Sequence, residues 1–128
     1  MEIDVAVPPD KAWALVGDPV GVPCWYPLYE TCTLDGDVRT LARADGVKLL
    51  ERLLDRDDER RYYAYGVIEG LPLAHHEASF EVHEADGGSR IVWHTVAEHE
   101  DPDIDMEARL AERQIEALGG LKRVLEES

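Results

Sequence analysis

Alternation of apolar and polar residues runs through most of the chain and predicts β-strands. In EIDVAV, Ile3, Val5 and Val7 share one face of the first predicted strand. Six further strands joined by tight turns are expected at 30–35, 38–46, 47–54, 60–68, 75–84 and 90–100. Because consecutive strands with short connections pair antiparallel, the pattern predicts one antiparallel sheet.

Helical periodicity is confined to three places. PPDKAWALVGDP, after the first strand, carries an apolar stripe and ends at Gly17, whereas VGVPCWYPLY contains two prolines and can form only a short helix or loop. From Pro102 and Asp103 onward, apolar residues recur at three- and four-residue spacing, which predicts a long amphipathic helix. The stripe of this last helix consists of Ala111, Ile115, Leu118, Leu121 and Leu125.

The stretch VKLLERLLDRDDERRYYAYG, residues 47–66, fits two structures. By residue preference LLERLL favours a helix, but that helix would lack a C-cap glycine and run directly into RRYYAYG, which has the aromatic content of a strand. DRDDE offers a turn between two apolar runs of similar length. We therefore predict a hairpin with strands at 47–54 and 60–68, in which Glu51 shares a face with Leu49 and Leu53.

The order of these elements predicts an α+β protein with a single domain over residues 1–128. A curved antiparallel sheet of about seven strands would wrap around the long C-terminal helix, and two short helices would follow the first strand. Such a wrap leaves a space between helix and sheet unless large side chains fill it.

Charge narrows the possible partners. The chain has 28 acidic and 13 basic residues and a net charge of −15, which repels phosphate backbones and anionic lipid headgroups. We therefore expect no nucleic-acid partner and no membrane partner. The N-terminus has no basic region of a signal peptide, so a cytoplasmic protein is expected. In the cytoplasm, Cys24 and Cys32 are expected to be small buried hydrophobic residues rather than a disulfide.

Several motifs in this order resemble the START-like superfamily, also called Bet v 1-like, SRPBCC or helix-grip, and within it the polyketide cyclase/dehydrase group. The motifs are VPPDKAWALVGD, WYP, GDVRTLARADG, ERLLDRDDERRYYAYGVIEGLPL and SRIVWHTV. The resemblance covers essentially the whole chain and implies the helix-grip fold. Because this superfamily includes enzymes, lipid carriers and hormone receptors, the resemblance is specific for the fold and weak for the reaction.

The stretch from VRTLARADG through LLERLLDRDDERRYYAYGVIEG is also similar to the plant abscisic acid receptors. On that match Glu51, Tyr65, His76 and Trp93 face the ligand cavity. The lysine that holds the hormone's carboxylate in the receptors falls on Tyr26 or its neighbour, and the gate loop is shorter. These departures argue against a hormone receptor.

Aromatic polyketide cyclases of this fold carry a pocket arginine on the strand that matches LLERLL. Arg52 is the only arginine in that stretch, but alternation places it on the face opposite Glu51. Arg39 and Arg43 share a face with Leu41 and are the better candidates for a pocket arginine.

Glu51 and His76 are the candidates for proton transfer. A buried carboxyl has a raised pKa that suits a general acid or base; alternatively, Glu51 forms a structural ion pair with Arg39 or Arg43. His76 shares an apolar face with its strand neighbours, and an imidazole carries protons at neutral pH. The alternative for His76 is a core histidine bonded to a tyrosine hydroxyl or a backbone carbonyl.

Aromatic residues at strand spacing form either plain core or, because they share the face of Glu51, a wall of the cavity around these polar groups. They are Trp25, Tyr63, Tyr65, Phe80 and Trp93, and in the related cyclases tryptophans near the matches of Trp25 and Trp93 line the cavity. Ala78 lies on the same face as Phe80. On the last helix Met106, Leu110 and Gln114 would form a lid, while Gly119 and Gly120 either leave room for a ligand or mark a local kink.

No metal site and no cofactor are expected. His75, His83, His94 and His99 fall on the outward face of their strands, and the chain lacks zinc-binding spacings such as CxxC or HExxH. The acidic run EHEDPDIDME is expected to be a solvated loop and a helix start.

The resemblance therefore implies binding of a hydrophobic or polyketide-like small molecule. The first hypothesis is an enzyme of the polyketide cyclase/dehydratase type, with Glu51 and His76 moving protons and Tyr65 and Tyr63 donating hydrogen bonds to an enolate oxygen. The second is a non-catalytic carrier or sensor of an apolar ligand. A third, a protein-interaction module with an acidic surface, would be favoured if side chains filled the cavity.

Overall fold

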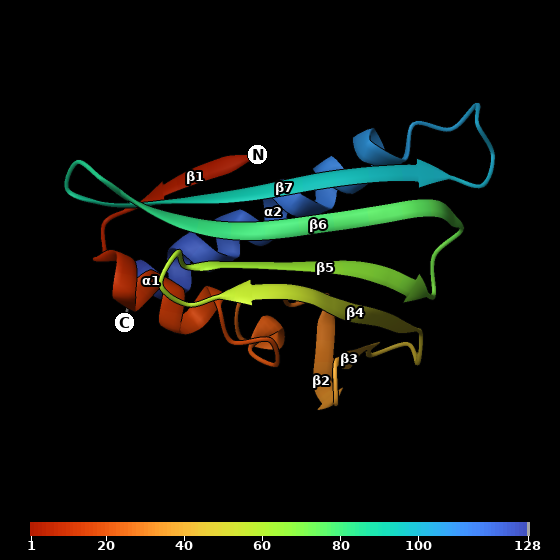
Figure 1. Ribbon diagram of the computed structural model, residues 1–128, viewed down its shortest axis with the longest axis horizontal. Coiled ribbons are helices and arrows are strands. Elements are labelled where there is room, and N and C mark those ends of the chain that lie inside the picture. Colours follow the sequence, from red (N-terminus) through yellow and green to blue (C-terminus); the bar gives the residue numbers. More distant parts are fainter. Residues whose placement is uncertain (128) are drawn as a thin grey trace.

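The computed structural model describes residues 1–127 and contains one antiparallel sheet of seven strands (Figure 1). The strands are β1 (Glu2–Val5), β2 (Tyr29–Asp35), β3 (Val38–Arg43), β4 (Lys48–Asp57), β5 (Tyr62–Glu69), β6 (Leu73–Ala85) and β7 (Gly88–His99). Their spatial order is β1-β7-β6-β5-β4-β3-β2. Strands β2 to β7 are thus successive hairpins, and β1 pairs with β7 at the far edge.

Three helical segments accompany the sheet: α1 (Pro9–Val16), the single 3₁₀ turn η1 (Val22–Cys24) and α2 (Met106–Glu127). In Figure 1, α2 runs along one face of the sheet behind β6 and β7, and β2 and β3 turn away from the direction of β4 to β7. Helix α2 packs against β1 and β7, and α1 packs against β6 and β7. The predicted helix-grip arrangement, with a curved sheet against a long C-terminal helix, is confirmed.

The β4–β5 hairpin confirms that LLERLL forms a strand despite its helical preference. Cross-strand pairing with RRYYAYG outweighs local propensity here, because both strands bury one face. The turn lies at 58–61, where Arg61 adopts a positive φ of 51°, so β4 extends three residues beyond its predicted end at Leu54. Register shifts beside Glu51 and after Leu53 interrupt the simple alternation of this pair.

Helix α2 begins later than predicted, and its buried face differs. It begins at Met106 rather than at Pro102, because the Asp105 carboxylate accepts the Ala108 N–H at 3.0 Å and caps the helix. The prediction that Ile115 belongs to the buried stripe is wrong, since its side chain is 64% exposed. The buried face is Met106, Gln114, Ala117, Leu118, Leu121 and Leu125. Ile115 lies roughly 100° around the helix from Gln114, outside that face.

Gly120 allows α2 to approach the backbone that follows η1. A Cβ at this position would lie 2.5 Å from the Trp25 carbonyl oxygen, whereas a Cβ at Gly119 would have no heavy atom within 4 Å. The expectation that Gly120 leaves room for a ligand is therefore wrong: the chain itself occupies that space. The helix is continuous across both glycines.

Candidate functional site

A cavity lies between the inner face of the sheet and α2, as the wrapped arrangement predicts. The space open to the centres of water molecules is about 70 Å³, and all non-atomic space out to the opening is about 610 Å³. Its lining residues are Val22, Trp25, Tyr26, Tyr29, Arg39, Leu41, Leu49, Glu51, Tyr65, Val67, Leu71, His76, Phe80, Trp93, Leu110, Arg113 and Gln114. Because aromatic and aliphatic side chains dominate this lining, the few polar groups among them define its chemistry.

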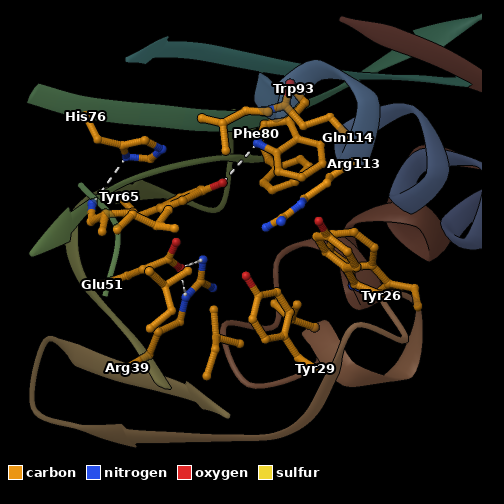
Figure 2. Close-up of a pocket in the computed structure, with 17 residues that line it drawn as sticks. Tyr26, Tyr29, Arg39, Glu51, Tyr65, His76, Phe80, Trp93, Arg113 and Gln114 are labelled. Carbon is orange, nitrogen blue, oxygen red and sulfur yellow. Dashed lines mark hydrogen bonds and ion pairs between the residues drawn. The ribbon is translucent and has the colours of Figure 1, made fainter. Parts of the chain in front are cut away.

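Glu51 is buried in the cavity wall and forms an ion pair with Arg39 (Figure 2). The two residues face each other across β3 and β4. Arg39 Nε and Nη2 lie 2.8 Å and 2.7 Å from the same carboxylate oxygen, Oε1. Arg39 Nη1 donates to the Pro19 carbonyl at 3.0 Å and to the Tyr63 hydroxyl at 3.5 Å. Both expectations for Glu51 therefore hold at once, since it lines the cavity and is paired.

The environment of Glu51 acts on its protonation in two directions. Complete burial raises the pKa of the Glu51 carboxyl above its ordinary value, while the charge and hydrogen bond of Arg39 oppose that rise. The Arg39 guanidinium stays charged, and it lies 4.7 Å from the centroid of the Tyr65 ring. The pair thus places a desolvated carboxyl with a perturbed pKa against an aromatic wall, which is typical of functional sites.

Arg43 does not reach the cavity, contrary to expectation. It lies at the end of β3, where the chain turns toward β4, and its guanidinium forms an ion pair at 2.8 Å with Asp45 of that turn. By strand alternation Arg43 belongs to the same face as Arg39 and Leu41. The strand ends at Arg43, however, and the acidic turn that follows provides a closer partner for its guanidinium. Arg52 lies on the outer face, as alternation predicts, and pairs with Asp37.

His76 lines the cavity at a gap in the sheet. Strands β5 and β6 pair only from Tyr62 to Tyr65, and beyond that point the Val67 N–H donates to His76 Nδ1 at 3.2 Å. In the neutral ring the proton is therefore on Nε2. Partial burial and the neighbouring His75 lower the pKa of His76 to about 4, so the ring is uncharged at neutral pH. His76 is thus a hydrogen-bond donor whose acceptor nitrogen is occupied.

The aromatic wall is a packed cluster. Phe80 stacks on Trp93 with ring centroids 4.6 Å apart, and Trp25 contacts both rings edge-on. Trp93 Nε1 donates to the Tyr65 hydroxyl at 2.9 Å, which leaves the Tyr65 proton available to another acceptor. Tyr63 is also buried, but it lies toward α1, with its ring 6.1 Å from that of Trp13, and it does not line the cavity.

Three other predicted contacts lie outside the cavity lining. Ala78 is buried in the sheet without lining the cavity, and Gly120 lies against Trp25. Met106 lies at the start of α2, beside a separate depression near the end of β7. Leu110 and Gln114 do line the cavity from α2, and the Gln114 amide donates to the Thr95 hydroxyl at 2.7 Å.

Sequence reasoning missed two polar groups of the cavity, Tyr29 and Arg113. Tyr29 is the last residue of the stretch WYPLY, of which the sequence identifies only Trp25 and Tyr26 as candidates for the pocket. Arg113 lies three residues after Leu110 and next to Gln114, and that spacing on the predicted lid could have identified it.

No group of three or more His, Cys, Asp or Glu side chains in the described part of the chain is placed to hold a metal ion. Both cysteines are free, and Cys24 is exposed, so the expectation that it is buried is wrong. Cys32 is partly buried. In residues 1–127 no helix is long and apolar enough to cross a bilayer.

Comparison with known families assigns the chain to one of them. The family model described as polyketide cyclase / dehydrase and lipid transport matches residues 1–126. The chain belongs to this family. No curated protein matches it in a search by sequence.

Solved structures similar to this family member share its fold over nearly its whole length. The protein XoxI from Bacillus cereus superposes with a TM-score of 0.88 at 23% identity, covering 98% of this chain and 92% of that one. A protein from Thermobifida fusca gives a TM-score of 0.75 at 26% identity, covering 97% and 90%. BexL, described as a di-domain ARO/CYC of the BE-7585A biosynthetic pathway, gives 0.83 at 14% identity, covering 98% and 45%.

Proposed function

We propose that this chain binds an apolar or aromatic small molecule in the cavity and promotes its cyclisation with loss of water, as a cyclase/dehydratase-type enzyme that needs no cofactor. The observation that carries the proposal is the buried Arg39–Glu51 pair at the wall of an otherwise apolar cavity. Buried ion pairs contribute little to stability relative to apolar residues of the same volume. A chemical role at the cavity accounts for the pair better than stability does.

Glu51 is the group that would move the proton. Both Arg39 contacts fall on Oε1, so we assign proton transfer to Oε2. The carboxylate would take a proton from the carbon next to a substrate carbonyl, and that carbon would attack a second carbonyl carbon of the same molecule. Returning the proton to the new oxygen gives a hydroxyl group. Removal of the second hydrogen from the same carbon, with departure of that hydroxyl as water, completes the dehydration.

Tyr65 and His76 would stabilise the negative charge that develops on the carbonyl oxygen. The Tyr65 hydroxyl already accepts a hydrogen bond from Trp93, and its own proton can be donated to substrate. The neutral His76 ring donates through Nε2 because Nδ1 is held by Val67. Donors aimed at a developing oxyanion lower the barrier in a water-poor site. In this scheme His76 is a donor, and Glu51 alone exchanges protons.

Hydrogen–deuterium exchange tests this role without the natural substrate. 2-Acetylnaphthalene in D₂O contains methyl hydrogens next to a carbonyl, and NMR measures the loss of their signal. The wild-type protein should accelerate this exchange, and Glu51→Gln should reduce the acceleration by about a hundredfold or more, the usual contribution of a general base. Exchange at the wild-type rate in Glu51→Gln would refute the assignment.

The second candidate is a carrier or sensor that binds an apolar ligand without changing it. One observation favours it: Glu51 Oε1 and His76 Nδ1, two proton acceptors of the cavity, are both engaged by protein donors. A carrier would bind 2-acetylnaphthalene and show a melting temperature that rises with its concentration. Exchange would then stay at the rate of the buffer. The cavity is not filled by side chains, so the condition that would favour an interaction module is not met.

A further inference from the structure

A third charged side chain enters the cavity from the wall opposite Glu51. Arg113 lies on α2 next to Gln114, and both line the cavity. Figure 2 shows the Arg113 side chain reaching from the helix into the cavity, between Tyr26 and the rings of Phe80 and Trp93. Its guanidinium therefore faces the space in which a ligand would lie.

Arg113 has no counter-ion in the described part of the chain. Within residues 1–127 it donates no side-chain hydrogen bond and forms no ion pair, although the net charge of the chain is −15. Most other arginines contact a carboxylate, from Arg39 on β3 to Arg90 on β7. Its helical neighbours Glu112 and Glu116 also form no ion pair with it. Arg109 and Arg123 of the same helix also form no ion pair within residues 1–127, so the lack of a counter-ion indicates a binding role only together with the position of Arg113 in the lining of the cavity.

A second donor without an acceptor belongs to the same cavity. Trp25 is 3% exposed and lines the cavity, and its Nε1 has no hydrogen-bond partner among residues 1–127. Buried indole N–H groups usually find an acceptor. The hydroxyls of Tyr26 and Tyr29 lie near Arg113, and burial raises the pKa of both phenols, so they too remain donors at neutral pH.

The charges of the cavity define the complementary ligand. Arg39 and Glu51 neutralise each other, which leaves Arg113 as one surplus positive charge. We infer that the ligand carries one carboxylate beside its apolar body and that Arg113 binds this carboxylate. A doubly charged phosphate would reverse the charge of the cavity instead of balancing it. This inference rests on the proposed function, because it names the class of molecule that the same cavity would bind.

The size of the cavity limits the apolar body. The 70 Å³ open to water centres corresponds to about five to seven water molecules at ~10–15 Å³ each. A ligand of one or two rings must therefore also use the wider opening, where Tyr26 is only partly buried and Arg113 is exposed. A carboxylate at this opening stays close to water while the rings enter the apolar part.

The test compares 2-naphthoate with 2-naphthamide, which has the same rings and nearly the same shape but no charge. Isothermal titration calorimetry on the whole protein should show about twofold to fivefold tighter binding of the acid, the range for an ion pair between groups that stay close to water. Arg113→Gln should remove this preference, because it weakens the binding of the acid more than that of the amide. Arg123→Gln, the matched control on the exposed side of the same helix, should keep it.

The possible outcomes separate this inference from the proposed function. Equal affinities for acid and amide in the wild-type protein would overturn the role of Arg113 while the cavity would still bind an apolar ligand. A preference for the acid that persists in Arg113→Gln would overturn it as well. Failure of both probes to bind would overturn the proposed function, and the inference with it.

Discussion

The two walls of the cavity, the sheet and helix α2, differ in whether their charged side chains are paired. On the sheet, Arg39 and Glu51 are buried, paired, and held further by the Pro19 carbonyl and the Tyr63 hydroxyl. On α2, Arg113 is exposed at the opening and has no partner within residues 1–127. The sheet wall is therefore preorganised, with its charges fixed before a ligand arrives. The helix wall keeps a charge available, so the proposed chemistry belongs to the sheet wall and the proposed binding of a carboxylate to the helix wall.

The largest expected effect comes from breaking the pair on the sheet wall. Glu51→Leu should lower the free energy of unfolding by about 3–5 kcal/mol, because it leaves the Arg39 guanidinium buried without a counter-ion. Urea-induced unfolding followed by circular dichroism measures this change. The matched double variant Arg39→Met, Glu51→Leu should recover most of the loss. A double variant as unstable as the single one would show that the pair is needed for folding in its own right.

The next effect tests what positions the helix wall. Gly120→Ala should destabilise the protein by about 1–3 kcal/mol, since the new Cβ would meet the Trp25 carbonyl and force α2 away from it. Gly119→Ala is the control on the same helix and should stabilise by about 1 kcal/mol through helix propensity, because its Cβ meets nothing. Thermal unfolding of both variants checks the opposite signs. Equal effects would mean that α2 does not rest on this contact.

A smaller effect is expected on the pH dependence of stability, and it comes from His76 at the gap between β5 and β6. The pKa of His76 is lowered to about 4 in the folded protein, below its unfolded value near 6.5, so the unfolded state binds a proton first as pH falls. Stability should therefore decrease between about pH 6.5 and 4. The decrease should be about 2 kcal/mol after allowance for the part of the ring that water screens.

Unfolding by urea at a series of pH values isolates this contribution as the difference between wild type and His76→Gln. His94→Gln, on the outer face of β7, should retain the wild-type profile. A His76→Gln variant with the same pH dependence as wild type would contradict the partly buried, neutral state of His76.

The smallest effect is expected on the helix wall itself. Arg113→Gln should change the free energy of unfolding by no more than about 0.5 kcal/mol, because the side chain is exposed and unpaired. Urea unfolding beside Arg39→Met, which removes the buried partner of Glu51, gives the contrast directly. A loss above about 1 kcal/mol in Arg113→Gln would indicate a structural role for this arginine.

The fold could be predicted from the sequence where a pattern repeats over many residues. The alternation in β6 and β7 and the spacing of Leu118, Leu121 and Leu125 each bury one face. The β4–β5 hairpin also followed, because the turn DRDDE and the aromatic partner strand outweigh the helical preference of LLERLL. Features set by a few atoms did not follow, such as the late start of α2 at the Asp105 cap.

The polar residues of the site could be predicted only in part. Alternation along the strands predicts Glu51 and His76 at the cavity, but it does not reveal where a strand ends, so it also predicts Arg43 there although Arg43 pairs within its own turn. Strands β5 and β6 separate beyond Tyr65, and the Val67 N–H donates to His76 there. This separation depends on the paths of both strands, so the sequence of either strand alone does not predict it. Arg113 was missed because an arginine beside glutamates on a helix is usually solvated.

The most direct test of the central claim uses the three tryptophans of the chain as reporters of where a ligand binds. Trp25 and Trp93 line the cavity, whereas Trp13 lies outside it and donates its indole N–H to Asp58 at 3.1 Å. In ¹H–¹⁵N NMR spectra, titration with 2-acetylnaphthalene should shift the indole signals of Trp25 and Trp93 and leave that of Trp13 in place. A shift of the Trp13 signal alone, or no shift at saturating ligand, would contradict a ligand site between the sheet and α2.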